Sequence, residues 1–80
     1  MTYEQAEELL EENKNEYNKD GRCYTKGLLL IEKYKPIDEV SKGDYEIYVQ
    51  EFIEDMTKED ILQLNRYGFH LDEDSWAYFT

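Results

Sequence analysis

The sequence predicts a single α+β domain in which a three-stranded antiparallel sheet packs against about three helices. Three observations predict this class. The first half of the chain carries apolar residues at helical spacing behind capping residues, and the second half carries a stretch of alternating polarity and a hairpin pattern. The chain is also short: 80 residues, of which 40% are apolar, support one modest core. Residues 1–80 are therefore expected to form one domain.

The first helix is expected from Tyr3 to about Tyr17 or Asn18. Thr2 and Gln5 have the spacing of a capping box, in which two side chains satisfy free N–H groups at a helix start. Apolar side chains then recur at helical spacing, and Asp20-Gly21 predicts a turn. The opposite face of the helix carries six glutamates: Glu4, Glu7, Glu8, Glu11, Glu12 and Glu16.

A second helix is expected from Lys26 to Tyr34, with Thr25 as its cap. The apolar run from Leu28 to Ile31 has no clear period, but leucine favours a helix. Pro36 predicts the end of this helix, because the residue before a proline is pushed out of the helical conformation. Residues 36–43 are then expected to form a turn or one loose helical turn.

A strand is expected from Asp44 to Gln50, because polarity alternates along it with the period of a half-buried strand. This alternation assigns Tyr45, Ile47 and Val49 to one face, and Asp44, Glu46 and Tyr48 to the other.

A third helix and a hairpin complete the expected fold. Thr57 begins a second capping box, and the helix should run to Tyr67. Gly68 fits the left-handed position that follows a helix end. Residues 69–72 and 76–80 then predict the two arms of a hairpin, which turns through residues 72–75.

The charge of the chain excludes several classes of partner. A net charge of −11 is repelled by nucleic acid, by phosphate-rich ligands and by anionic membranes, so a basic protein surface is the expected partner. No apolar run approaches the roughly 18–20 residues of a membrane span, and no secretion signal is evident. The single cysteine, Cys23, agrees with a reducing compartment, and we expect the protein in the cytoplasm.

No catalytic or cofactor-binding motif is present in the sequence. There is no phosphate-binding glycine loop, no His-Glu-x-x-His and no pair of cysteines. His70 and Asp72 fall on one face of a strand and Cys23 lies between two cations, which leaves acid–base or thiol chemistry as a distant alternative. The acidic run 72–74 lacks the glycine and the distal glutamate of a calcium loop. We therefore expect no enzyme activity, no cofactor and no metal.

A row of four glutamates at steps of four residues follows the first helix. Each step advances about 6 Å along the helix axis, a spacing of the same scale as that of nucleic-acid phosphates. The row is locally unfavourable, since each like-charge pair costs about 0.2–0.5 kcal/mol. Two interpretations remain open: a solvated face that serves solubility, and a surface that mimics phosphate and occupies a basic groove. Under the second, the expected contact residues are Glu4, Glu8, Glu12, Glu16, Tyr48, Glu51, Glu54 and Asp55.

An aromatic contact surface is the alternative. The chain has eight tyrosines, and tyrosine is enriched at interfaces. On the last strand Trp76 and Tyr78 share one face and Ala77 and Phe79 the other, and the sequence favours Trp76 in the core. This alternative describes a small interaction or assembly module whose exposed surface is centred on Tyr48, Trp76 and Tyr78.

The second half of the chain resembles a group of small, mostly uncharacterised proteins of phages and bacterial mobile elements. Residues 43–49 and 59–79 carry this resemblance, although the group often has tryptophan at the place of Phe69 and a longer turn before Ser75. The resemblance implies a counter-defence role in a bacterial host cell, and in size and charge the chain looks like an anti-CRISPR inhibitor. We therefore expect a non-enzymatic anti-CRISPR or anti-restriction protein. It would bind a basic nucleic-acid-binding protein, such as a CRISPR effector or a restriction enzyme, by mimicking phosphate charge.

Overall fold

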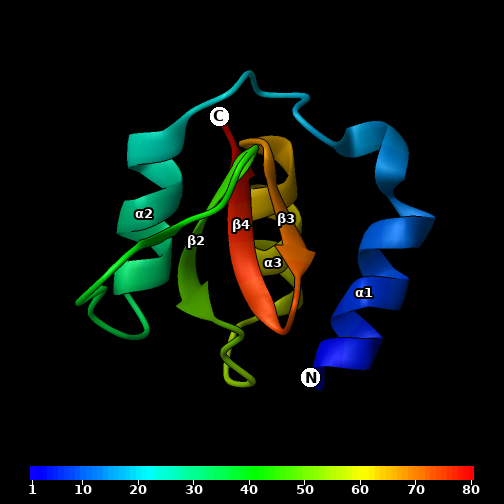
Figure 1. Ribbon diagram of the computed structural model, residues 1–80. Coiled ribbons are helices and arrows are strands. Elements are labelled where there is room, and N and C mark those ends of the chain that lie inside the picture. The colour runs from blue at the N-terminus through cyan, green and yellow to red at the C-terminus, as the bar shows by residue number, and fades with distance from the viewer.

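The computed structural model describes residues 1–80 and contains three α-helices, one 3-10 helix and four strands (Figure 1). The α+β class expected from the sequence is confirmed. In chain order the elements are α1 (Tyr3–Glu12), η1 (Lys14–Glu16), α2 (Tyr24–Glu32), β1 (Ser41–Lys42), β2 (Glu46–Glu51), α3 (Lys58–Arg66), β3 (Phe69–Asp72) and β4 (Ser75–Phe79).

The sheet has four strands instead of the three expected. Its order is β1-β2-β4-β3, and every neighbouring pair is antiparallel. The additional strand is β1, whose residues Ser41 and Lys42 pair with Tyr48 and Ile47 of β2. The expected turn or loose helical turn over residues 36–43 is therefore wrong at its end, because a strand of two residues is too short to show an alternating pattern.

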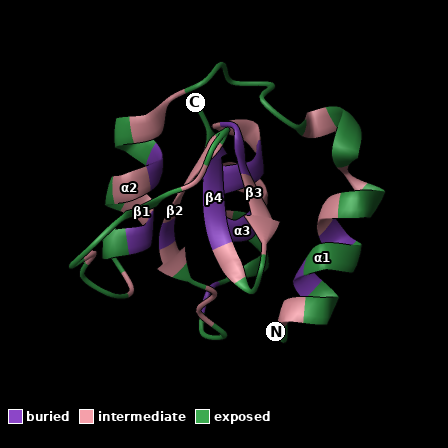
Figure 2. Cartoon of the chain, in the orientation of Figure 1, coloured by how far each residue is buried: buried purple, intermediate pink, exposed green.

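The core lies between the sheet and the helices. In Figure 1, α3 lies behind the sheet, with α1 and α2 on its two sides. Trp76 and Tyr78 point into the core, as the sequence favoured, and Ala77 and Phe79 lie on the opposite face of β4. Buried residues follow β4 and part of α3 (Figure 2). The buried apolar cluster comprises Ala6, Leu9, Ile31, Val49, Met56, Ile61, Leu64, Phe69, Trp76 and Tyr78.

The start of α3 is fastened to the end of α2. The Thr57 hydroxyl accepts a hydrogen bond from Asp60 N (3.2 Å), which confirms Thr57 as the cap. The expected capping box is incomplete, because Thr57 N donates to the Tyr34 hydroxyl instead of the Asp60 side chain. Lys33 Nζ lies 2.7 Å from Asp60 Oδ2, and the Tyr34 hydroxyl donates to the same oxygen. Burial alone would raise the pKa of Asp60, but the hydrogen bonds from Lys33 and Tyr34 outweigh it and hold this pKa below its ordinary value.

The end of α3 is capped by residues 13–23, which we call the capping segment. The last carbonyls of a helix have no partner within the helix, so they need donors from elsewhere. Gly68 takes a φ of +95°, as expected for the residue after the helix end. Three backbone N–H groups of the capping segment then reach these carbonyls: Asn18 donates to Asn65 (2.9 Å), Asp20 to Arg66 (3.1 Å) and Cys23 to Tyr67 (3.1 Å).

The capping segment explains why α1 ends at Glu12, and not at Tyr17 or Asn18 as expected. Asn13 Nδ2 bonds back to Leu9 O (2.8 Å), and the next three residues tighten into η1. The N–H of Asn18 cannot donate both to a carbonyl of a longer α1 and to α3. It donates to Asn65 O of α3. Helical spacing in the sequence therefore overestimates the length of α1 by more than a turn.

The starts of α2 and β2 also differ from expectation. α2 begins at Tyr24, so Thr25 lies inside the first turn and no side chain caps this helix. In β2, Ile47 and Val49 face the core as expected, but Tyr45 precedes the strand and is 78% exposed. The alternation is real, and its first position lies in the turn before the strand.

Substitution of Gly27 by alanine should destabilise the protein. Glycine in a helix usually costs about 1 kcal/mol relative to alanine, so Gly→Ala normally stabilises. Here a Cβ would lie 2.6 Å from Phe69 Cζ and closer still to Phe69 Cε1. The Phe69 ring is fully buried, so it has no space to move away from this clash. We expect Gly27→Ala to lower the free energy of unfolding by about 1–3 kcal/mol in urea denaturation. Leu29→Ala, on the exposed side of the same helix, should change it little.

Asp60, Lys33 and Tyr34 form what we call the Asp60 cluster, and its contacts predict a loss of stability in acid. A carboxyl group with a lowered pKa stabilises the fold above its unfolded-state pKa, and this contribution is lost as the pH falls through the folded-state pKa. Asp60→Asn should therefore lower the free energy of unfolding by about 1 kcal/mol at neutral pH, with a difference that shrinks in acid. Urea denaturation at several pH values checks this, and Asp44→Asn, at an exposed position, should show no such trend.

Candidate functional site

The exposed face of α1 carries several glutamates that form no ion pair. Ala6 and Leu9 face the core, and every glutamate of the helix lies on the exposed side (Figure 2). Lys14 pairs with Glu11 at 3.5 Å, and both side chains are well exposed. The glutamates of α1 that form no ion pair are Glu4, Glu7, Glu8 and Glu12.

Glu16 does not belong to this row. Because α1 ends at Glu12, Glu16 lies in η1 and turns toward α3. Its carboxylate lies 2.9 Å from Lys19 Nζ and 3.3 Å from Arg66 Nη2. The hydrogen bond from Lys19, followed by that from Arg66, lowers the pKa of Glu16. The expected row of four is therefore wrong at its last member, whose charge is neutralised.

The three other acidic residues proposed from sequence lie near the start of α1. Glu51 and Glu54 line a hollow of about 540 Å³ together with Glu4, and Asp55 is exposed in the same loop. The hollow also contains Glu73 and Asp74, which the sequence places in the hairpin turn and not in the expected contact set. Both have positive φ values in the two-residue turn between β3 and β4, and they line this hollow together with Tyr3 and Glu4 of α1. A local signal for a turn does not show which surface the turn will join.

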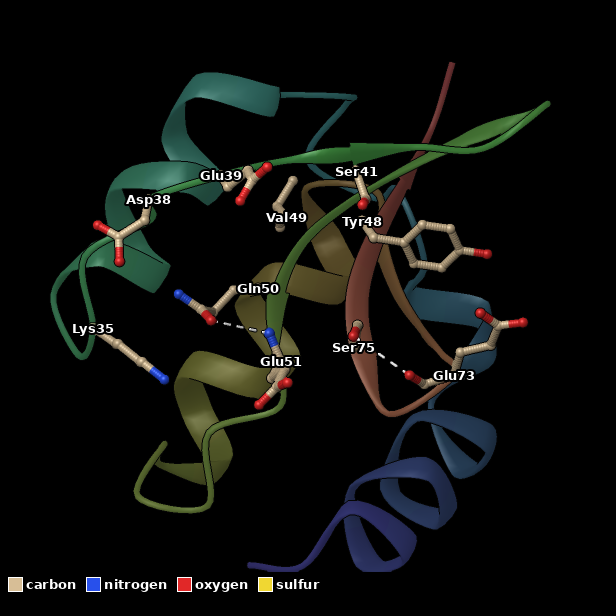
Figure 3. A pocket seen from close by; sticks show the side chains of 10 residues that line it. All are labelled: Lys35, Asp38, Glu39, Ser41, Tyr48, Val49, Gln50, Glu51, Glu73 and Ser75. Carbon is tan, nitrogen blue, oxygen red and sulfur yellow. Dashed lines mark hydrogen bonds between the residues drawn. The ribbon is translucent and has the colours of Figure 1, made fainter.

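A second hollow, of about 510 Å³, adjoins the first over β2 and the loop before β1 (Figure 3). The two hollows share Glu51, Glu73 and Ser75, so one acidic surface continues from α1 to this loop. Lys35 is the only cation among the residues that line either hollow. We call this continuous surface, together with the exposed face of α1, the acidic surface.

Tyr48 points away from the core, as expected, but it does not join an exposed aromatic surface. Trp76 and Tyr78 are buried on the opposite face of the sheet. The expectation that these three side chains form one exposed surface is therefore wrong. The Tyr48 hydroxyl donates to Asp72 Oδ2 at 3.0 Å, and hydrogen bonding with Glu46, burial and Asp72 together raise the pKa of Tyr48.

The two residues considered for chemistry are in different surroundings. Cys23 is half-buried at the start of α2, and its neighbour Arg22 packs over the Tyr78 ring and donates to Phe79 O. His70 shares an outer face with Asp72, as expected, but its Nε2 lies nearest Glu46 Oε2, at 3.4 Å. No group of His, Cys, Asp or Glu side chains has the arrangement to hold a metal ion.

Comparisons with protein-family models, with curated proteins and with solved structures find no match to this chain. None of its helices has the length and apolar character needed to cross a membrane.

Charge reversal should act in opposite directions at Glu8 and Glu16. Glu8→Lys replaces two repulsive pairs, with Glu4 and Glu12, by attractive ones, so it should raise the free energy of unfolding by about 1 kcal/mol. Glu16→Lys removes the partner of Lys19 and Arg66 and should destabilise the protein. Urea denaturation at low salt measures both effects. In about 1 M salt both should shrink, since exposed charges are then screened.

Proposed function

We propose that the protein is a non-enzymatic inhibitor that binds a basic nucleic-acid-binding protein through the acidic surface. The partner is of the class to which CRISPR effectors and restriction enzymes belong, and the inhibitor occupies the groove that would hold nucleic acid. This proposal rests on the charge of the surface and on the resemblance of the second half of the chain to small phage proteins.

The observation that carries the proposal is the exposed row of Glu4, Glu8 and Glu12 on α1. No cation pairs with any of the three, because the basic side chains that form ion pairs do so with Glu11, Glu16, Glu46 and Asp60. Successive members of the row advance about 6 Å along the axis, on the scale of the phosphate spacing of a nucleic-acid strand. A helix selected for stability alone would interleave lysines with these glutamates.

The physical basis of such binding is electrostatic steering. A surface of one sign attracts an oppositely charged groove over several ångströms and speeds association, and salt weakens this attraction. The contact set differs from the one expected from sequence. Lys19 and Arg66 neutralise Glu16, and the Tyr48 hydroxyl donates a hydrogen bond to Asp72. The proposed contacts are Glu4, Glu51 and Glu54, which line the first hollow with Glu73 and Asp74, and the exposed Glu8, Glu12 and Asp55.

Capture from a bacterial lysate tests the proposal. The immobilised protein should retain a nucleic-acid-binding protein at low salt and release it at high salt. Glu8→Lys combined with Glu12→Lys should weaken this capture about 10- to 100-fold, because two attractive contacts become repulsive. The matched control combines Glu32→Lys with Asp44→Lys, which changes the net charge equally at exposed positions outside the acidic surface. Circular dichroism verifies that both variants are folded.

Two results would contradict the proposal. One is capture that survives high salt, and the other is equal loss of capture in the matched control. Salt-resistant capture that Tyr45→Ala abolishes would instead support an aromatic interaction module, since Tyr45 is the most exposed large hydrophobic side chain.

A further inference from the structure

β3 is an edge strand of the sheet. It pairs only with β4, and no strand lies on its other side. The N–H and C=O groups on the free side of an edge strand have no partner in the sheet, so they can pair with another chain. Figure 1 shows α1 on this side of β3, but no backbone group of the helix bonds to the strand.

The hairpin turn determines which backbone groups of β3 are free. Glu73 and Asp74 both have positive φ values, as in a type I′ turn, so Asp72 and Ser75 close the turn as a hydrogen-bonded pair. Hydrogen-bonded and non-hydrogen-bonded pairs alternate along an antiparallel ladder, so the N–H and C=O of Leu71 point away from β4. No backbone group of a turn, loop or cap bonds to either of them.

A hollow of about 190 Å³ opens along this free edge. Successive side chains of a strand point to opposite faces, yet those of His70 and Leu71 both line the hollow, so it lies at the edge and not on one face. We call the hollow and the free side of β3 the edge groove. Its residues are Glu7, Leu10 and Glu11 of α1, Asn65 of α3, and His70 and Leu71 of β3.

Charge and polarity alternate around the edge groove. Glu7 and Glu11 are exposed on α1, and no lysine or arginine lines the groove. Asp72 continues β3 on the outer face of the sheet, which is turned away from the core, and forms no ion pair. Leu10 and Leu71 are instead packed against the core. An added strand would therefore meet carboxylates on one side and apolar side chains on the other.

We propose that the edge groove binds an extended segment of another protein in which lysine or arginine alternates with apolar residues, and that this segment adds a fifth strand beside β3. In this mode of binding, main-chain hydrogen bonds hold the segment and its alternate side chains select it. The occupant is not a second copy of the chain, because two molecules of net charge −11 repel each other. The inference goes beyond the proposed function, since it concerns backbone pairing at β3 and not the row of glutamates on α1.

The register of the added strand follows from the free groups of Leu71. In an antiparallel pair, as throughout this sheet, one residue of the segment exchanges both hydrogen bonds with Leu71. Directly opposite residues share a face, so the side chain of this residue lies beside Leu71 and is apolar. Its two neighbours in the segment point to the outer face, where Asp72 lies, and are basic.

The peptide acetyl-Lys-Val-Lys-Val-Lys-amide is a suitable probe, and NMR of the labelled protein follows its binding. In the free protein the amide hydrogen of Leu71 should exchange with solvent faster than that of His70, which is in a hydrogen-bonded pair with Ala77. The peptide at low salt should shift the Leu71 amide signal and slow its exchange at least about tenfold.

Methylated peptides separate backbone pairing from charge attraction. Methylation of both valine N–H groups keeps the charge but removes the donors that face β3, so binding should fall at least about tenfold. Methylation of the central lysine N–H, which points away from β3, should leave most of the binding intact.

A pair of substitutions tests the acidic wall of the groove. Glu7→Gln combined with Glu11→Gln should weaken binding of the peptide roughly 2- to 10-fold, because two exposed charge contacts are lost. Glu32→Gln combined with Asp44→Asn removes the same charge at exposed positions outside the groove and should change binding little.

Three results would overturn the proposal. The first is equal binding of the unmodified and the valine-methylated peptides, since charge alone would then explain it. The second is an unchanged Leu71 amide signal at millimolar peptide. The third is protection of this amide that rises with protein concentration in the absence of peptide, since the edges of two copies would then pair. None of these depends on capture of a nucleic-acid-binding protein from a lysate.

Discussion

The carbonyl groups at the end of α3 impose the constraint on which the rest of the structure depends. A buried acceptor without a partner costs about 1–3 kcal/mol, and three carbonyls of this helix end are met by N–H groups of Asn18, Asp20 and Cys23. Residues 18–23 of the capping segment must therefore cross the end of α3 outside any helix. The chain that continues from it emerges on the other side of α3, so α1 and α2 lie on opposite sides (Figure 1). With the Asp60 cluster at its start, α3 is held at both ends.

The same constraint shapes the acidic surface. A longer α1 would have carried a fourth glutamate in the row, but the capping segment turns Glu16 toward Arg66. What remains is a shorter, unpaired row that continues past the start of α1 into the two hollows. The repulsion within α1 is small beside the burial of Ala6 and Leu9, which fastens the helix to the core. Charge can therefore accumulate on this face without unfolding the helix.

The outer face of the sheet, turned away from the core, is partly buried although α3 covers only the inner face. On the inner face, Trp76 and Phe69 pack against the helices. On the outer face, a small residue at Ala77 lets side chains from β2 and β3 meet above β4, and their contacts are polar. The inner face derives its stability from apolar burial, which is insensitive to pH. The outer face is closed by polar side chains, among them Tyr48, whose hydroxyl donates to Asp72 Oδ2.

The sequence by itself determined the elements whose signals are local: the cap at Thr57, the left-handed Gly68, the hairpin that follows, and the core side of Trp76. It also determined the size of the negative charge and the glutamate-rich face of α1. Only the tertiary structure decided where α1 ends, that β1 joins the sheet, that Glu16 is neutralised, and that the hairpin turn joins the acidic surface. Each of these depends on contacts between residues far apart in the chain, and no local spacing encodes such partners.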